Sequence, residues 1–424
     1  MKKRKSILLS IFTFTMFLFA LINTQYSANA ASTNLIDPSN TKLHYEGRID
    51  NTNPKAVKLL WEGSTIKTNF EGTSLKMQLE NNSDNYLNVF IDGKLTVLKC
   101  VNGDNVYTIA SGLEDKVHSV EVFKRTEASM GAVIFKGFIL DDGKQLIKTE
   151  QANNLKIEFY GDSITAGACD EDPGADQWDD HSTHNNYMSY GAITARELNA
   201  EYMCTAVSGI GVTHGYQTYT MPQLWDKIAY DPNSATWNYN SWQADYVVVN
   251  LGENDKSTGV IGDFTSEYVK LVKNIREKYP NASIFCVLGP MSAGQDETFI
   301  NYVSSAVNTL KVAGDKKIFF HKFSQYSSGH PRIETNIKVA DELVKFIKDS
   351  TNTGIDDINA TLSYTAQYDN GNESGINVII KNNSSTAING WKLNFTFLGN
   401  QTILNMWNGT FTQKDKSVTI TNAS

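Results

Sequence analysis

Three short segments of the chain hold residues whose types and order suit acyl transfer to a serine. Gly-Asp-Ser at 161–163 and Gly-Glu-Asn-Asp at 252–255 each follow an apolar run, and Ser-Gly-His-Pro stands late, at 328–331. A serine hydroxyl needs a base to take its proton, and N–H groups stabilise the oxyanion that its attack produces. The candidate nucleophile, base and oxyanion donor are therefore Ser163, His330 and Asn254.

The position of the serine segment favours this chemistry. A short strand at 155–160 that ends in Gly-Asp-Ser and opens into a helix places the Ser163 hydroxyl at the carboxyl edge of a sheet, where open α/β folds bind ligands. The helix that follows directs backbone N–H groups at developing negative charge. Because Gly-Asp-Ser is also common in turns, the tripeptide alone leaves both interpretations open.

The apolar rhythm between 155 and 349 predicts the elements that position these groups. Five apolar runs alternate with four helical patterns, which indicates a βαβ series with a parallel sheet and helices on both faces. Asn254 then falls at the same carboxyl edge as Ser163. The expected strands are 155–160, 202–207, 245–251, 284–288 and 317–321, and the expected helices are 187–198, 264–278, 297–312 and 334–348.

Two strand-rich regions flank this series. Short alternating runs closed by turn residues over 35–150 predict an antiparallel β-sandwich, and strand-like alternation resumes at 361–424 after a polar linker at 350–360. A chain of 424 residues, 41% of them hydrophobic, is too long for a single core. The fold class is therefore multidomain: a β-sandwich, the α/β domain of 155–349, and a partial C-terminal β-sandwich.

The first 30 residues are predicted to be a signal peptide. Four cations at positions 2–5 precede an apolar stretch at 7–22, and Ala-Asn-Ala at 28–30 suits a signal peptidase. The protein is therefore expected to be secreted and extracellular, an uncleaved anchor being the alternative. The formal net charge of −8, made more negative by cleavage, argues against nucleic acid and membrane surfaces as partners.

The cysteines give no sign of a metal site. Cys100, Cys169, Cys204 and Cys286 are widely spread, with no CxxC pair and no zinc spacing. Secretion would permit disulfides, but Cys204 and Cys286 lie within apolar runs, where buried free thiols are the commoner outcome.

The motifs together resemble those of the SGNH (GDSL-type) hydrolases, whose four blocks are matched in order by Gly161-Asp162-Ser163, the end of the second strand, Gly252-x-Asn254-Asp255 and His330. Within that superfamily the chain is similar to carbohydrate esterase family 2, the acetylxylan and acetylglucomannan esterases. This closer resemblance covers 35–349 and implies that the N-terminal sandwich is a jelly roll. The segments that carry it are Gly-Asp-Ser-Ile-Thr at 161–165, 186–196, Ser-Gly-Ile-Gly at 208–211 and 284–290.

The resemblance implies a role for each motif residue. Ser163 is the nucleophile and His330 the base, while the Ser163 N–H, a glycine N–H from the second strand and the Asn254 side chain form the oxyanion hole. Gly211 is the preferred glycine and Gly209 the second, because the two-residue repeat leaves the alignment ambiguous. No metal and no organic cofactor are implied.

Two departures from the family pattern concern the histidine. SGNH enzymes commonly carry an Asp two or three residues before it, where this chain has Ser328 and Ser327. Either a backbone carbonyl orients His330, giving a Ser–His dyad, or a distant carboxylate does so, or the site is impaired. Related enzymes often place Trp beside the histidine, where this chain has Gly329, and Tyr216 is the candidate to supply that sugar-binding surface, with a core or turn role as the alternative.

Other attractive residues are expected to have ordinary roles. The acidic, His-containing loop at 170–184 has no fixed ligand spacing and is interpreted as a solvated, mobile insertion in preference to a metal site. His214 and His321 are rivals to His330 as the base. Neither lies in the late loop before the last helix, where this order of elements requires the base.

The tail from 361 resembles a family 2 carbohydrate-binding module. Such modules bind cellulose or xylan through exposed aromatic residues, and Tyr368 and Trp407 fall at two of those positions, whereas Trp391 is expected to pack inside. The sequence covers some 60 residues of a sandwich that usually needs ~100. The last strands and a third aromatic residue are therefore expected to be missing.

The sequence thus predicts a secreted carbohydrate esterase that removes acetyl groups from plant cell-wall polysaccharide, acetylxylan or acetylglucomannan, through an acetyl-serine intermediate. One alternative is a catalytically impaired carbohydrate-binding protein on a hydrolase scaffold. Another is a lipase or thioesterase of the same superfamily, for which no long apolar lid is visible. The sequence does not choose between the two polysaccharides, the acetyl position or the oligomeric state.

Overall fold

The computed structural model describes residues 34–149, 155–351, 360–370, 373–382, 391–397 and 401–422. The predicted signal peptide and most of the predicted linker lie outside the described residues. The chain divides into two compact units, Met1–Ile347 and Lys348–Ser424. Within the described ranges, no helix has the length and apolar character that crossing a membrane requires.

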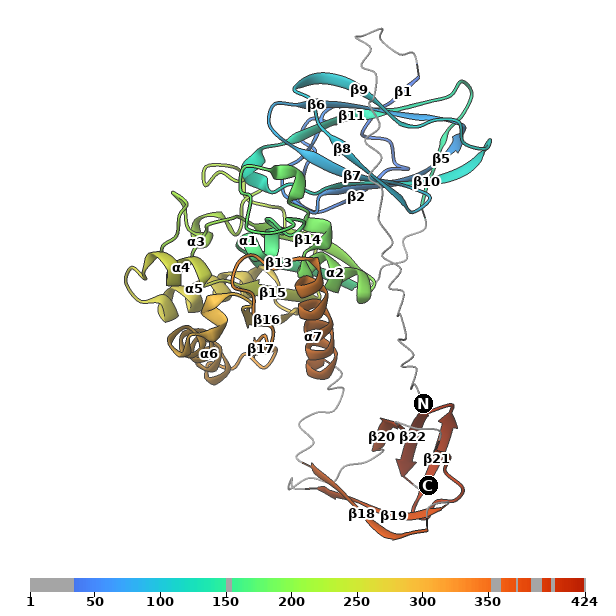
Figure 1. The fold of residues 1–424 in the computed structure, drawn as a ribbon, viewed down its shortest axis with the longest axis vertical. Helices are drawn as coiled ribbons and strands as arrows, with labels where there is room; N and C mark the ends of the chain where they lie inside the picture. Colours follow the sequence, from blue (N-terminus) through green and yellow to red (C-terminus); the bar gives the residue numbers. More distant parts are fainter. Residues whose placement is uncertain are drawn as a thin grey trace, which may run out of the picture. The chain divides into compact units, whose positions relative to one another are not determined.

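The N-terminal region of the first unit is a sandwich of two antiparallel sheets (Figure 1). One sheet has the order β3-β4-β11-β6-β9 with β1 paired to β11, and the other has the order β12-β5-β10-β7-β8 with β2 paired to β5. Apolar side chains that alternate along the strands fill one core between the sheets. The strands are β1 Leu35–Ile36, β2 His44–Glu46, β3 Ile49–Asp50, β4 Val57–Leu59, β5 Thr65–Gly72, β6 Leu75–Asn81, β7 Tyr86–Ile91, β8 Lys94–Lys99, β9 Gly103–Ala110, β10 Lys116–Lys124, β11 Val133–Leu140 and β12 Leu146–Ile147.

The rest of the first unit is a parallel five-stranded sheet between helices, in the order β14-β13-β15-β16-β17. Its strands are β13 Leu155–Gly161, β14 Ala200–Ala206, β15 Tyr246–Asn250, β16 Ser283–Leu288 and β17 Ile318–Lys322. Its helices are α1 Ser163–Ala166, α2 Tyr190–Glu197, α3 Met221–Leu224, α4 Glu253–Thr258, α5 Phe264–Lys278, α6 Glu297–Val312 and α7 Ile333–Thr351, and η1 Ala128–Met130, η2 His181–Thr183, η3 Asn186–Met188 and η4 Ser292–Gln295 are single 3₁₀ turns.

Alternation along the strands divides the sheet's apolar side chains between two cores. Val247 and Val249 of β15 share one core with α5 and α6, whereas the intervening Val248 shares the other with α2 and α7. Burial on both faces explains why these strands read as continuous apolar runs. The predicted α/β series is confirmed, with α5 and α6 at their predicted bounds.

The register of the parallel strands brings the motif segments to one edge. Gly161 pairs with Ala206 on one side and with Asn250 on the other, so β13, β14 and β15 end at the same level. The segments that follow these strands carry Ser163 at the start of α1, the glycines at 209 and 211, and Asn254 in α4. The sheet thus delivers residues from distant parts of the sequence to a single site.

The second unit begins with the last turn of α7, and its other regular elements among the described residues are strands. β18 Ala360–Asp369 pairs with β19 Ser374–Asn382, and a second sheet has the order β20-β22-β21, with β20 Lys392–Thr396, β21 Gly409–Lys414 and β22 Ser417–Asn422. Tyr368 is 56% exposed and Trp407 is 79% exposed. The multidomain fold class is confirmed.

Candidate active site

Ser163 stands at the first position of α1, immediately after β13. The Asp162 side-chain Oδ1 accepts the Ile164 N–H at 3.0 Å and caps the helix. A Cβ at Gly161 would lie 2.0 Å from Thr165 Oγ1, so only glycine permits this close turn from strand to helix. Ser163 is 5% exposed, which holds its hydroxyl in one environment.

His330 lies against Ser163, and a carboxylate lies behind it. Its Nε2 is 2.8 Å from Ser163 Oγ, and its Nδ1 is 2.7 Å from Asp176 Oδ2. The other Asp176 oxygen accepts a hydrogen bond from Arg332 at 2.9 Å. The dyad oriented by a backbone carbonyl is therefore wrong, and the distant-carboxylate alternative is the one observed.

The environment of Asp176 keeps it ionised. Burial opposes its charge, but hydrogen bonds from His330 and Arg332 outweigh that effect and hold the pKa of the Asp176 carboxyl below its ordinary value. A carboxylate at Nδ1 fixes the proton on that nitrogen and leaves Nε2 to accept the serine proton. The three side chains thus have the connectivity of a Ser–His–Asp triad.

Asp176 belongs to the loop that the sequence suggested was a solvated insertion. Residues 173–175 and 177–180 are indeed exposed, but the interpretation is wrong for the two ends of the loop, which are buried or partly buried. Asp170, Asp172 and His184 of this loop are at most 4% exposed. The loop also supplies Trp178, whose ring centroid lies 4.5 Å from that of His330 in an edge-on contact and which is 44% exposed. An aromatic neighbour of the histidine is therefore present, although Gly329 occupies the expected position.

The sequence contained one signal for these two residues. A loop with acidic residues and a Trp directly after the nucleophile helix could have been tested as the source of both missing groups. Asp176 lies 154 positions before His330, however, and no sequence spacing relates them. Tyr216 is 71% exposed, and its role as a sugar-binding surface stays a prediction.

The Gly-Glu-Asn-Asp segment ties three loops together. Glu253 accepts hydrogen bonds from Ser292 Oγ and the Ala293 N–H at 2.6 Å each, which holds the loop after β16. Asp255 accepts the N–H groups of Val212 and Thr213 at 2.8 and 2.7 Å, which holds the loop after β14. The flanking carboxylates therefore fix the position of Asn254 between them.

Asn254 reaches the loop that carries the two candidate glycines. Its Nδ2 donates to the Ile210 carbonyl at 2.9 Å and makes a longer contact of 3.4 Å with Asp162 Oδ2. Gly209 is partly exposed and has φ +82°, whereas Gly211 is buried. This geometry favours Gly209 over Gly211 as an oxyanion donor.

The two rival histidines lie in other surroundings. His214 Nδ1 is 3.1 Å from the Gly259 carbonyl, and His321 Nε2 is 2.7 Å from Glu342, with its ring stacked on Phe346. Among the described residues, His330 is the histidine in hydrogen-bond contact with Ser163.

One group of side chains has the spacing of a metal site. Ligand atoms of Cys169, Asp172 and Asp176 lie within 4.8 Å of one another. Burial, with the charges of Asp172 and Asp176 adding to it, raises the pKa of the Cys169 thiol to about 12, so the thiol is protonated in the metal-free protein. The Asp176 carboxylate is already hydrogen-bonded to His330 and Arg332. All four cysteines are buried and free, as the sequence indicated for Cys204 and Cys286.

The parallel sheet and the serine–histidine–aspartate geometry define a carboxylic ester hydrolase of the GDSL type, and comparisons agree with this class. Residues 45–149 match the carbohydrate esterase 2 N-terminal family, 159–321 the GDSL-like lipase/acylhydrolase family and 358–424 the cellulose binding domain family. A solved family two carbohydrate esterase from Clostridium thermocellum, in complex with cellohexaose, is 34% identical, with 73% of this chain and 99% of that chain covered and a TM-score of 0.69. The chain belongs to carbohydrate esterase family 2.

Two curated relatives are similar over most of this chain. The cellulase/esterase CelE of Acetivibrio thermocellus is 36% identical over 325 residues, which cover 74% of this chain. Those residues span 40% of that relative's length. An acetylxylan esterase / glucomannan deacetylase of Cellvibrio japonicus is 27% identical over 293 residues, covering 64% of this chain and 80% of that protein.

Replacing Asp176 by Asn should lower kcat for a soluble acetyl ester by ~10²–10⁴ with KM little changed, because the imidazole loses the group that fixes its tautomer. Asp179→Asn, an exposed change in the same loop, should leave kcat within about twofold and serves as the control. Steady-state kinetics of both variants check this, and an Asp176→Asn enzyme with wild-type kcat would contradict the triad.

The raised pKa of the buried Asp162 carboxyl predicts that the stability of the protein depends on pH. Burial, together with the charges of Glu253 and Asp255, raises the pKa of the Asp162 carboxyl to about 8, so the folded protein keeps its proton while the unfolded chain releases it near pH 4. Asp162 should therefore make the protein less stable as pH rises from about 5 to 8. In the variant Asp162→Asn the side chain would be neutral throughout and could still cap Ile164.

Thermal unfolding at pH 5 and pH 8 measures this effect. The drop in melting temperature between the two pH values should be smaller in Asp162→Asn than in wild type. Asp263→Asn is the control, because the pKa of this exposed carboxyl is lowered by its Ser266 hydrogen bond and both states are ionised across that range. An equal drop in wild type and Asp162→Asn would show that Asp162 is ionised when folded.

Proposed function

We propose that the protein is a secreted esterase that removes O-acetyl groups from plant cell-wall polysaccharide, either acetylxylan or acetylglucomannan. The observation that carries the proposal is the chain of contacts from Ser163 through His330 to Asp176, at 2.8 and 2.7 Å. A serine whose hydroxyl is in hydrogen-bond contact with an oriented imidazole is the arrangement needed for acyl transfer.

The proposed reaction has two halves. Ser163 Oγ attacks the acetyl carbonyl as His330 Nε2 takes the hydroxyl proton; the tetrahedral oxyanion then collapses, and His330 returns the proton to the departing sugar oxygen. In the second half, water attacks the acetyl-serine as His330 takes its proton; the bond to Ser163 Oγ then breaks, His330 returns the proton to Oγ, and acetate leaves. Asp176 holds the imidazole in place during both halves.

Three N–H donors are proposed to bind the oxyanion: the backbone N–H groups of Ser163 and Gly209, with Gly211 as the alternative, and the Asn254 amide. The Asn254 nitrogen carries two hydrogens, of which one bonds the Ile210 carbonyl at 2.9 Å. The second makes only the 3.4 Å contact with Asp162 and would turn to the oxyanion. Removing one such donor typically lowers turnover by ~10²–10³.

The polysaccharide substrate is supported by three observations. A relative named acetylxylan esterase / glucomannan deacetylase covers 64% of the chain, and residues 358–424 match the cellulose binding domain family. Trp178 presents a half-exposed ring beside His330, suited to stacking on a sugar.

The tail is proposed to bind cellulose or xylan through Tyr368 and Trp407, both exposed. Secretion through residues 1–30 is consistent with such insoluble substrates. The rival interpretation, a binding protein on an impaired hydrolase, was motivated by the missing acid and by the binding-module tail, and Asp176 removes the first of these reasons.

Replacing Ser163 by Ala should abolish acetate release from acetylated xylan and glucomannan, because no oxygen remains to form the acetyl-enzyme. Fold and polysaccharide binding should be unchanged, which circular dichroism and a pull-down on insoluble cellulose measure. Comparing acetate release from the two polysaccharides by wild-type enzyme identifies the substrate. Wild-type protein without activity on any acetylated glycan would overturn the proposed function.

Ending the chain after Thr351 should leave kcat for a soluble acetyl ester within about twofold, because Ser163, His330 and Asp176 all lie before that residue. Retention on insoluble cellulose should fall strongly, because the truncated chain lacks Tyr368 and Trp407, which are proposed to tether the enzyme to the fibre. Full-length Trp407→Ala is the matched variant for the binding assay. A large loss of soluble activity on truncation would mean that the tail contributes to the active site.

A further inference from the structure

One segment of the jelly-roll domain runs between two loops of the hydrolase. Residues 125–127 lie between β10 and η1, and their backbone and side chains contact the hydrolase directly. The Asn186 N–H donates to the Arg125 carbonyl at 3.0 Å, which places this segment beside the loop that carries Asp176. The other side of the segment faces the loop after β14.

Arg125 holds the end of the loop that carries the triad acid. Its side chain is 1% exposed and donates to the carbonyls of Ser182 at 2.7 Å and His184 at 3.0 Å. Its remaining bonds go to Asn88, at 3.2 Å, and to the carboxylate of Glu171. One buried guanidinium therefore binds both arms of the 169–184 loop as well as the jelly roll.

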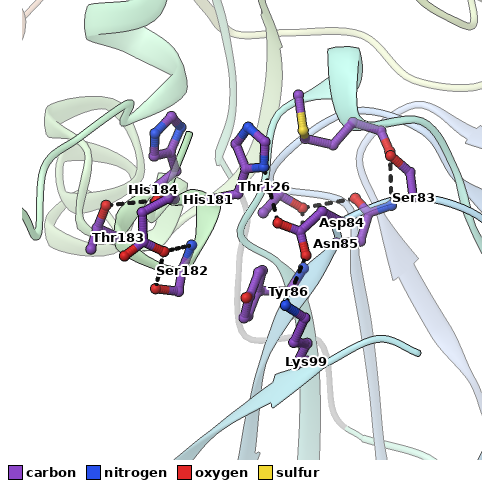
Figure 2. A network of polar contacts seen from close by, with 12 residues as sticks. Ser83, Asp84, Asn85, Tyr86, Lys99, Thr126, His181, Ser182, Thr183 and His184 are labelled. Carbon is purple, nitrogen blue, oxygen red and sulfur yellow. Dashed lines mark hydrogen bonds and ion pairs between the residues drawn. The ribbon is translucent and has the colours of Figure 1, made fainter. Parts of the chain in front are cut away.

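Two further jelly-roll side chains bind the end of the same loop and the residue that follows it. Asn88 donates to Asn185 Oδ1 at 2.9 Å, and Asp84 lies 3.1 Å from His181 Nδ1. Figure 2 shows the Asp84 carboxylate between His181 of the loop and Lys99 of β8. Asp176 and Trp178 lie between the two ends of the loop that these contacts fix.

Glu127 holds the second loop. Its side chain is 5% exposed, and Oε2 accepts the Ser208 N–H at 2.8 Å, one residue before Gly209. Glu62, also from the jelly roll, accepts the Ala206 and Ala128 N–H groups at 3.0 Å each, which ties the segment to the end of β14. The backbone that presents the candidate oxyanion glycine is thus anchored to carboxylates of another domain.

We propose that Arg125 and Glu127 are positioning residues of the esterase, and that the jelly-roll domain is a working part of its active site. Arg125 holds Asp176 against His330 by fixing the 169–184 loop, and Glu127 holds the oxyanion glycine by fixing Ser208. The proposal rests on the proposed function. Displacement of a reacting group by about 1 Å can reduce rate ~10²-fold, which is the scale on which these anchors act.

A matched control exists within the same domain interface. Arg48 is also a fully buried jelly-roll arginine that crosses to the hydrolase, where it bonds Glu158 at 2.8 Å and the Lys227 carbonyl at 2.7 Å. Its Nε makes a second bond to Glu158, at 3.2 Å, and its other bonds go to the hydroxyls of Tyr160 and Tyr239. Its described partners therefore lie outside the 169–184 loop and do not include Ser208. A purely structural role predicts equal effects for Arg48 and Arg125.

The first experiment compares Arg125→Lys with Arg48→Lys in the full chain, each alone and combined with Asp176→Asn. Lysine keeps the charge but cannot make the four bonds of Arg125. We expect Arg125→Lys to lower kcat for 4-nitrophenyl acetate ~10–100-fold with KM within about threefold, and Arg48→Lys to lower the melting temperature with kcat within about threefold. In the Asp176→Asn background, Arg125→Lys should lower kcat no more than about threefold, because the two act through one group.

The second experiment tests Glu127. Glu127→Ala should lower kcat ~10-fold or more, and Glu127→Gln should restore most of it because its amide oxygen still accepts the Ser208 N–H. The loss should persist at full size with Asp176→Asn, because Glu127 acts through the oxyanion glycine and not through the triad acid. If Arg125→Lys fails to fold, the milder variant His181→Ala tests the role of the 169–184 loop instead. It should lower kcat about threefold to tenfold, again only when Asp176 is present.

A readout independent of the substrate separates this proposal from the proposed function. The rate at which a fluorophosphonate labels Ser163 depends on the triad and not on carbohydrate, and it should fall in Arg125→Lys by the same factor as kcat. An unchanged labelling rate, or a loss of equal size with and without Asp176, would overturn the positioning role. Normal labelling of wild type without acetate release from any glycan would overturn only the proposed substrate.

Discussion

The hydrogen-bonded chain from Ser163 through His330 to Asp176 is the constraint on which the rest of the structure depends. Its three members come from α1, from the 169–184 loop and from the segment before α7, and both contacts must lie within hydrogen-bond distance at once. The end of β13 before α1, the contacts that anchor the 169–184 loop and the start of α7 must therefore all place these three residues correctly at the same time. Because proton transfer falls off steeply with poor geometry, the scaffold has to be stiff at these points.

The parallel sheet provides most of that stiffness. Gly161, Ala206 and Asn250 stand at one level of three neighbouring strands, so the following loops begin from fixed positions. Glu253 and Asp255 then tie the loops after β16 and β14 to α4 through charged hydrogen bonds. Hydrogen bonds to carboxylates are stronger than those between neutral groups. The bonds of Glu253 and Asp255 therefore restrict the movement of Asn254, which lies between them in the chain.

The jelly roll contributes where the sheet does not reach. The 169–184 loop is long for an active-site loop and contains buried acidic groups, which would be unstable without partners. Arg125 satisfies the loop's carbonyls from outside the α/β domain, and Glu62 and Glu127 satisfy N–H groups at the end of β14. Burial strengthens these polar contacts, so the interface between the two domains is also part of the frame of the active site.

The sequence by itself determined the α/β series, the bounds of α5 and α6, and the pairing of Ser163 with His330, because apolar periodicity and short motifs are local properties of the chain. Only the tertiary structure decided that Asp176 orients His330, that Trp178 stands beside it and that Gly209 is more accessible than Gly211. Asp176 lies 154 residues from its partner in a loop that resembles a solvated insertion, because loop composition records polarity but not contacts. Long-range hydrogen bonds leave no periodic trace in a sequence, and they appear only when the domains are folded against each other.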